Sequence, residues 1–133
     1  MTTMLPDLQA AVLCEDVRAE LSGQHSIVGI IAGIAAPVLP IGFLKLCLWS
    51  RWCGGVGSFT QRSVIVSCDE ETPINEAVIN FDLNEVEAQA TNVHIFGGVQ
   101  FQKYGVYHVE IYLGEALRMR FPLPVIQVSM PQA

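Results

Sequence analysis

The sequence predicts an all-β fold, an antiparallel immunoglobulin-like or C2-like β-sandwich of about eight short strands. Apolar and polar residues alternate with a period of two along most of the chain, and turns with Gly, Pro, Asn or charged residues separate these segments. No segment carries the sustained apolar stripe of an amphipathic helix. Since 133 residues make one ordinary domain and no linker or internal repeat interrupts them, we expect a single domain over residues 1–133.

The first half of the chain begins with three expected strands. Ala10–Glu15 and Ile27–Ile34 are apolar segments, and the Pro-containing loop "AAPVLPIG" separates the second from the third. The third strand starts near the "FLKL" segment and alternates most clearly, because three leucines share one of its faces: Leu44, Leu46 and Leu48. This alternation is typical of a half-buried strand.

Five more strands are expected after these. They are Ser58–Ser67, Ala77–Leu83, Gln89–Phe96, Tyr107–Leu113 and Leu117–Phe121. The glycine of "LGEA" predicts a tight hairpin between the last two, which should therefore pair antiparallel. A short helix or a turn is expected at Leu83–Gln89.

The uncharged run Ile27–Leu44 has nearly the length of a membrane-spanning helix. Pro37 and Pro40 lie at its centre, and a lone span has no neighbouring helices to satisfy the carbonyls that proline frees. We therefore expect two strands and a loop here, and no membrane span.

The strand Ile27–Ile34 is apolar on both faces, although one face of a strand in a two-layer sandwich normally meets water. Ile27 and Ile31, spaced by Gly29 and Gly33, form the face that needs a cover. Either another part of the chain covers this face or a second subunit does, since exposed apolar patches mark association sites. The candidate interface therefore consists of Ile27, Gly29, Ile31 and Gly33.

The charge of the chain limits its partners. Thirteen acidic and seven basic side chains give a net charge of −6, and no cluster of Lys or Arg is present. A nucleic-acid binder needs such a basic surface to contact phosphates, and so does a protein that binds anionic membranes. We expect a homo-oligomer or a protein partner, with no nucleic acid.

Four cysteines, Cys14, Cys47, Cys53 and Cys68, lack C-x-x-C or zinc-ribbon spacing, and the N-terminal residues do not form a secretory signal. We therefore expect reduced thiols in a cytoplasmic protein.

The sequence predicts no catalytic, cofactor-binding or metal-binding residues, because signatures such as G-x-S-x-G are missing. The densest polar stretch is "LCEDVR", where Cys14, Asp16 and Arg18 form a candidate polar corner. With His25, this corner is the alternative site of a small enzyme or ligand binder. Whether the acidic turn Asp69–Glu71 binds a cation stays open, since no second acidic loop is present to complete a calcium cage.

Two segments resemble a known family. These are "AVLCEDVRAELSGQHSIVGIIAGI" and "YGVYHVEIYLGEALRMRFPLPV". They are similar to the opening strands and the closing hairpin of small, mostly bacterial, single-domain β-sandwich-like proteins of unknown function. The matching positions are Cys14, Asp16, Arg18, Gly23, Gly29, Gly105, Tyr107 and Pro122. The resemblance implies a fold but no reaction and no cofactor.

We therefore expect a non-catalytic binding or structural module that self-associates or docks a protein partner through apolar strand faces. The alternatives are the enzyme or ligand binder described above and a component of a virion or a filament.

Overall fold

The computed structural model describes residues 3–129, within which nine β-strands form the secondary structure and no helix occurs. In chain order they are β1 (Asp7–Ala19), β2 (His25–Ile30), β3 (Ile34–Ala36), β4 (Ile41–Cys53), β5 (Gly57–Val66), β6 (Pro73–Leu83), β7 (Gln89–Phe101), β8 (Gly105–Leu113) and β9 (Ala116–Gln127). Residues 3–129 form no helix, so they contain no helix that is long and apolar enough to cross a bilayer.

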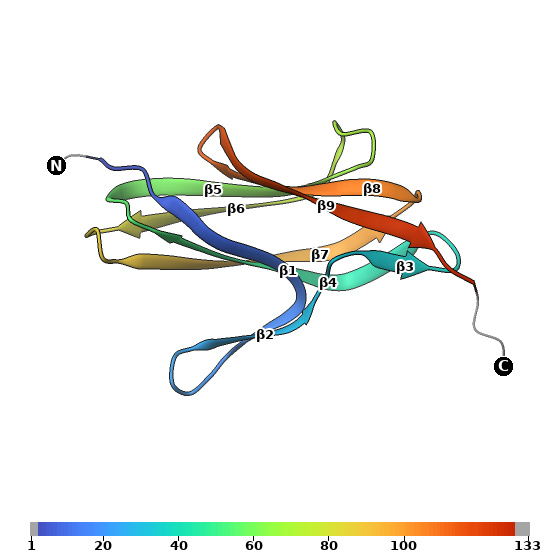
Figure 1. Ribbon diagram of the computed structural model, residues 1–133, viewed down its shortest axis with the longest axis horizontal. Coiled ribbons are helices and arrows are strands. Elements are labelled where there is room, and N and C mark those ends of the chain that lie inside the picture. The colour runs from blue at the N-terminus through green and yellow to red at the C-terminus, as the bar shows by residue number, and fades with distance from the viewer. Residues whose placement is uncertain (1–2, 130–133) are drawn as a thin grey trace.

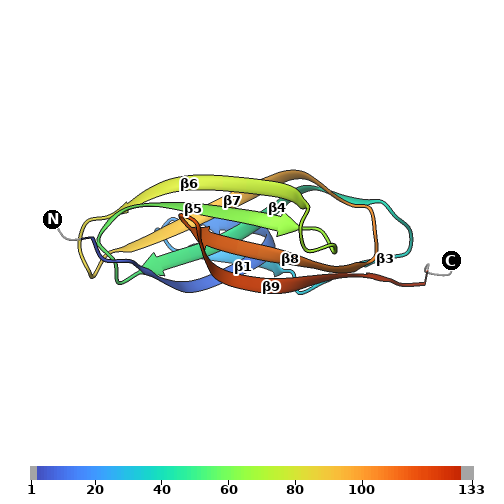
Figure 2. The same cartoon turned by 90° about the horizontal axis from the view of Figure 1, so that it is seen from above.

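The strands form two sheets that pack face to face (Figures 1 and 2). Sheet 1 has the order β2-β1-β4-β7, and sheet 2 has the order β3-β9-β8-β5-β6. All neighbouring strands are antiparallel except β3 and β9, which are parallel. The predicted all-β sandwich is confirmed, and its finer immunoglobulin-like or C2-like character stays a prediction.

The predicted strands coincide closely with observed ones, with one correction. The segment Ile27–Ile34 is not one strand, because β2 ends at Ile30 and Ile34 begins β3 in the other sheet. The connection between β6 and β7, where a helix or a turn was expected, contains a turn closed by the Ala88 N–H, which donates to the Glu85 carbonyl at 3.0 Å.

Gly29 explains part of this break. It has a φ of +68°, a backbone conformation that residues with a Cβ rarely adopt. A Cβ at this position would lie 2.7 Å from Oε2 of Glu15 on the paired strand. Two residues later, the Ile31 N–H donates to the Leu13 carbonyl at 2.8 Å, and the chain then crosses to sheet 2.

The core lies between the sheets and contains large side chains from both. Trp52 of sheet 1 stacks on Phe81 of sheet 2, with ring centroids 5.8 Å apart. Phe101 meets Tyr107 edge to face at 4.9 Å, where the chain passes from β7 to β8. The Tyr107 hydroxyl donates to the Lys103 carbonyl at 2.9 Å and accepts from the Lys103 N–H at 3.2 Å, which fixes this crossing between the sheets.

Leu44 corrects the predicted alternation of β4. Leu46 and Leu48 are fully buried as expected, but Leu44 is 95% exposed. On β7, the buried residues Phe96 and Val99 are three positions apart instead of two or four, and Gly98 between them has a φ of +60°. The register of β4 and β7 is the same on both sides of Leu44 and Gly98, which do not pair, so the alternation shifts at this point in both strands and Leu44 leaves the core.

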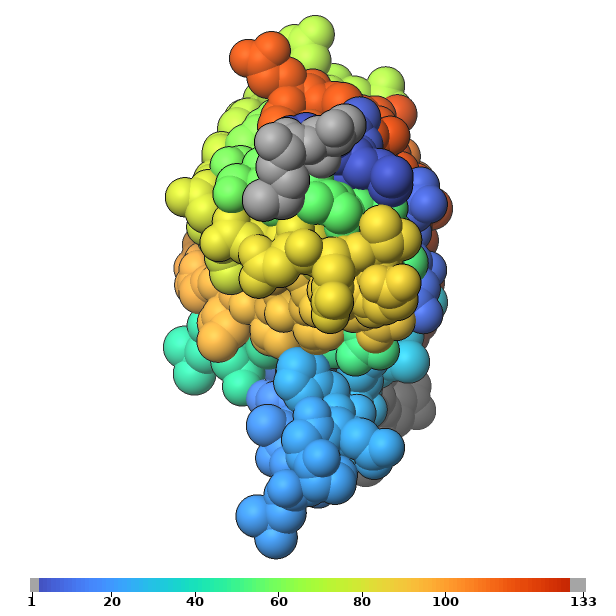
Figure 3. Space-filling view, turned by 90° about the vertical axis from the view of Figure 1, so that its left-hand side faces the viewer, coloured from blue at the N-terminus to red at the C-terminus, as the bar shows by residue number. Residues whose placement is uncertain are grey.

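A hairpin projects from the sandwich (Figure 1). β1 pairs with β4 as far as Cys14, and beyond this residue it pairs with β2 alone. We call residues 15–30 the projecting hairpin. Figure 3 shows this blue segment extending below the rest of the molecule.

Candidate interaction surface

The structure divides the candidate interface between two places. Ile27 and Gly29 lie on β2, in the projecting hairpin. Ile31 lies beyond the end of β2, partly buried against the core, so the chain itself covers this side chain. Gly33 approaches sheet 2, since a Cβ there would lie 3.2 Å from the Pro124 carbonyl oxygen. The four residues therefore do not form one strand face, and only Ile27 and Gly29 lie on the projecting hairpin.

The polar corner joins the projecting hairpin to sheet 1. Lys45 Nζ of β4 donates to Asp16 Oδ1 at 2.8 Å, and Arg18 Nε lies 3.7 Å from Asp16 Oδ2. The hydrogen bond from Lys45 lowers the pKa of the Asp16 carboxyl. This carboxylate is thus held by a cation at the base of the hairpin.

Cys14 completes the corner as a buried thiol. It lies directly opposite Cys47 of β4, and each thiol contacts a backbone carbonyl, that of Cys47 at 3.5 Å and that of Glu15 at 3.9 Å. Burial raises the pKa of the Cys14 thiol to about 11. At neutral pH it is protonated, and a protonated, buried thiol is a poor nucleophile.

His25 makes a second attachment between hairpin and sheet. The Trp49 indole Nε1–H donates to His25 Nδ1 at 3.0 Å. The guanidinium of Arg51 lies over the Trp49 ring, 5.1 Å from its centroid. Among residues 3–129, no hydrogen bond or ion pair joins His25 to the polar corner, and each binds β4 separately.

The acidic turn is satisfied by its own chain. Asp69 Oδ1 accepts from the backbone N–H groups of Glu71 and Thr72 at 2.8 Å, and these bonds together with the Thr72 hydroxyl lower the pKa of Asp69 to about 2. Glu70 accepts from Arg120 at 2.8 Å. In the part of the chain that the structure describes, no three His, Cys, Asp or Glu side chains are arranged to hold a metal ion.

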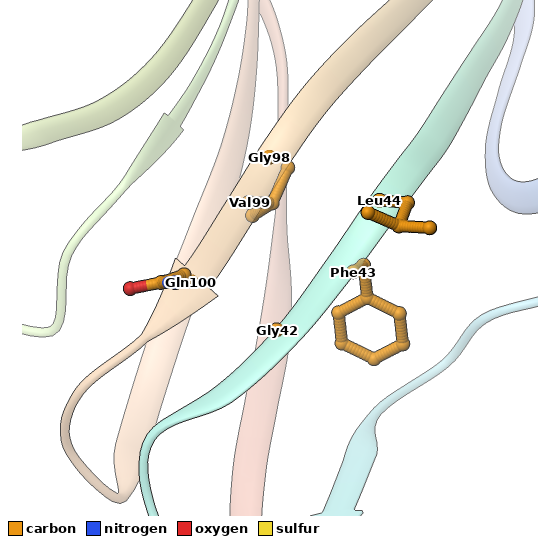
Figure 4. Close-up of a pocket in the computed structure, with 6 residues that line it drawn as sticks. All are labelled: Gly42, Phe43, Leu44, Gly98, Val99 and Gln100. Carbon is orange, nitrogen blue, oxygen red and sulfur yellow. The ribbon is translucent and has the colours of Figure 1, made fainter.

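Sequence reasoning missed a hollow on the β4 and β7 side of sheet 1. It measures about 290 Å³ and is lined by Gly42, Phe43, Leu44, Gly98, Val99 and Gln100 (Figure 4). In Figure 4, Leu44 and Phe43 point in different directions from β4. The adjacent glycines in "FGGV" were a usable signal, because glycine inside a strand often marks a distortion or a close approach.

A buried polar cluster was also missed. Gln61 lies at its centre: its Oε1 accepts from Trp52 Nε1 and Asn92 Nδ2, both at 2.8 Å, and its Nε2 donates to the hydroxyls of Ser50 at 3.0 Å and Ser63 at 2.9 Å. These bonds saturate the Gln61 amide. The cluster lies inside the sandwich, so it fixes the core and offers no accessible site.

His94 is a second buried polar group on β7. It is 4% exposed, and neither of its ring nitrogens has a hydrogen-bond partner within residues 3–129. Burial lowers the pKa of the imidazole, so the ring is neutral inside the sandwich.

Two comparisons with known proteins bear on the chain. The model of one protein family, described as a family of unknown function (DUF6941), matches residues 9–126. This range includes both segments that carry the resemblance found in the sequence. A search of the curated proteins gave no match.

Proposed function

Because the chain belongs to DUF6941, a family of unknown function, we propose its function from its surface: a non-catalytic β-sandwich module that binds protein, first of all copies of itself. The contact surface in this proposal is the projecting hairpin and the adjoining outer face of sheet 1.

The observation that carries the proposal is the exposure of apolar side chains on the projecting hairpin. Leu21 at its tip is fully exposed, and Ile30 at the end of β2 is 66% exposed. An extension that presents apolar side chains away from the core gains little for the monomer and offers area to a partner.

The outer face of sheet 1 extends this surface. Ile30, Cys14, Cys47 and Ile95 are opposite one another across β2, β1, β4 and β7, so they form one row on this face. Ile95 at the far end of the row is 62% exposed, and Leu44 lies further along β4. Cys14 and Cys47 in the middle of the row are buried, so the exposed apolar area beside the hairpin comes from Ile95 and Leu44.

The polar groups of the corner support a non-catalytic role. Asp16 is bonded to Lys45, His25 accepts from Trp49, and the Cys14 thiol is protonated. None of these side chains has the pairing of nucleophile and base that covalent catalysis requires. Their bonds attach the hairpin to β4, which is a structural task.

The strand order supports the finer assignment of an immunoglobulin-like sandwich. β1-β4-β7 facing β9-β8-β5 corresponds to the A-B-E and G-F-C strands of that fold, and Tyr107 corresponds to its tyrosine corner. The correspondence is a fold-level analogy. The four free cysteines support a cytoplasmic location.

Sedimentation velocity tests the proposal over a protein concentration of about 1 µM to about 200 µM, the range in which interfaces of modest affinity form. We expect the mass to rise above that of the 14.5 kDa monomer as concentration increases. The variant Leu21→Ser/Ile30→Thr should weaken this rise. Val78→Thr, a matched change at a 58% exposed residue of β6, should not. A wild-type protein that stays monomeric throughout would overturn the proposal.

A further inference from the structure

We propose that two copies of this chain pair through their β2 strands, antiparallel and about a two-fold axis, so that two four-stranded sheets join into one of eight strands. This inference rests on the proposed function, since it names the partner and the strand that contacts it.

β2 is an edge strand that carries an unused row of backbone groups. It pairs with β1 on one side, and on the other side no strand among residues 3–129 is its neighbour in sheet 1. An edge strand of this kind presents N–H and C=O groups to a further strand. Figures 1 and 3 show the hairpin extending beyond the sandwich, so the body of a second copy has room to approach it.

The composition of β2 leaves this edge unprotected. His25–Ile30 contains no Lys, Arg, Asp, Glu or Pro, the residues with which natural sheets keep edges from pairing. The peptide groups on its free edge are therefore open to another strand, and of its apolar side chains Ile30 is exposed while Ile27 and Val28 are half-buried.

The uncovered edge of β9, in contrast to that of β2, carries residues that oppose strand pairing. β3 covers only its last residues, Val125–Gln127, and the uncovered part holds two arginines and two prolines: Arg118, Arg120, Pro122 and Pro124. Proline removes a donor from an exposed edge, and charged side chains oppose pairing. The chain therefore protects β9 and leaves β2 open.

β6 and β7, the edges on the other side of the sandwich, shield each other. Asn75 Nδ2 of β6 donates to the Gly97 carbonyl of β7 at 3.2 Å. β6 also begins with Pro73 and carries Glu76. Neither edge is as open to a second copy as β2.

A second copy is the partner that suits β2 best. Two chains of net charge −6 repel each other, so they associate most easily where neither presents a charge, and β2 is uncharged. Antiparallel pairing about a two-fold axis lets one strand serve both partners. With the axis at Ile27, this side chain meets its own equivalent, and apolar pairs across antiparallel strands stabilise the sheet.

The strand pair is short, which sets the expected affinity. Six residues are too few to bury the roughly 800 Å² per partner of a standard interface. We therefore expect a reversible dimer whose population depends on protein concentration.

A charge-exchange experiment tests the geometry by sedimentation velocity. Ile27→Lys and Ile27→Glu should each stay at the monomer mass of 14.5 kDa when studied alone, because the two-fold axis places like charges opposite each other. Mixed in equal amounts, the two variants should restore a species of twice that mass. Val78→Lys and Val78→Glu, alone and mixed, are the matched controls and should associate like the wild type.

An uncharged variant tests the pairing even if a charged residue at position 27 disturbs the structure of the hairpin. Ile27→Cys, treated with a short bis-maleimide reagent at high protein concentration, should give a covalent dimer in greater yield than Val78→Cys or the wild type. Equal yields for the three proteins would contradict the pairing.

The outcomes separate this inference from the proposed function. A wild type that associates while all Ile27 variants behave like it overturns β2 pairing and leaves self-association in place. Ile27 variants that dissociate alone but do not recombine when mixed overturn the two-fold geometry. A wild type that stays monomeric overturns both proposals.

Discussion

The sandwich and the projecting hairpin are held together in different ways. The sandwich buries large side chains such as Trp52 and Phe101 between two sheets and saturates the amide of Gln61 with four hydrogen bonds. The hairpin is attached to β4 by the bonds of Asp16 and His25, and two of its apolar side chains, Leu21 and Ile30, are exposed. The large buried core thus lies in the sandwich, and the projecting hairpin, which we propose as the contact surface, lies outside it.

Gln61→Ala should produce the largest loss of stability. It leaves the Trp52 indole, the Asn92 amide and the Ser50 and Ser63 hydroxyls without their shared partner inside the core. We expect the free energy of unfolding to fall by about 3–5 kcal/mol, because unsatisfied buried polar groups are costly. Urea denaturation measures this. A change as small as that of Thr60→Ala, an exposed residue of the same strand, would contradict the role of the cluster.

Gly29→Ala tests the junction between the two regions. The new Cβ would collide with the Glu15 side chain, at 2.7 Å, in a backbone conformation that alanine disfavours. We expect a loss of about 2 kcal/mol, mainly from the strained φ because the exposed Glu15 side chain can turn away, and weaker self-association from the distorted strand. Gly97→Ala is the control, because its Cβ meets only an ordinary contact at 3.9 Å. If Gly29→Ala self-associated as strongly as the wild type, the claim that the hairpin mediates association would be contradicted.

His94 makes the stability of the sandwich depend on pH. Burial lowers the pKa of His94 in the folded protein from its ordinary value of 6.5. As the pH falls below about 6.5, the unfolded chain therefore binds a proton at this residue before the folded chain does. Stability should therefore fall with decreasing pH in this range, by at most about 1.4 kcal/mol per pH unit from this residue. Thermal denaturation between pH 7 and pH 5 measures the slope, and His94→Leu should reduce it. An unchanged slope in that variant would assign the dependence to other groups.

His25→Ala should have the smallest effect, confined to the hairpin. It removes the acceptor of the Trp49 indole, a hydrogen bond worth about 1 kcal/mol at an exposed site. Amides of the hairpin should exchange faster with solvent, while the melting temperature of the sandwich changes little. Faster exchange in β5 or β8 would show that the hairpin and the core are not independent.

The strands of the sandwich were predictable because one face of each sheet is buried and the other faces solvent. Apolar and polar residues therefore alternate with a period of two in the sequence. The same rule misplaced Leu44, since the irregular backbone at Gly98, opposite Leu44, shifts the alternation, and the residues around Leu44 in the sequence do not reveal this shift. The rule also predicted one strand from Ile27 to Ile34, because β2 on the hairpin and β3 beside the core are equally apolar. Only the fold separates them.

The proposed contact surface stays a prediction, and the structure shows where its residues lie. Ile27 and Gly29 were found from an apolar strand with no obvious cover, and they lie on the open edge of sheet 1. Ile31 was grouped with them because sequence spacing does not reveal that the chain turns back to the core after Ile30. The Gln61 cluster had a signal, since Ser50 shares the inward positions of Leu48 and Trp52, but its partners come from strands distant in sequence.

Hydrogen exchange of the wild-type protein at low and high concentration tests the central claim, that the projecting hairpin carries association. The account predicts that the amides of His25–Ile30 become protected as concentration rises from about 1 µM to about 200 µM, while those of β6 and β9 do not change. Protection that appears in β6 or β9 instead, with β2 unaffected, would contradict it.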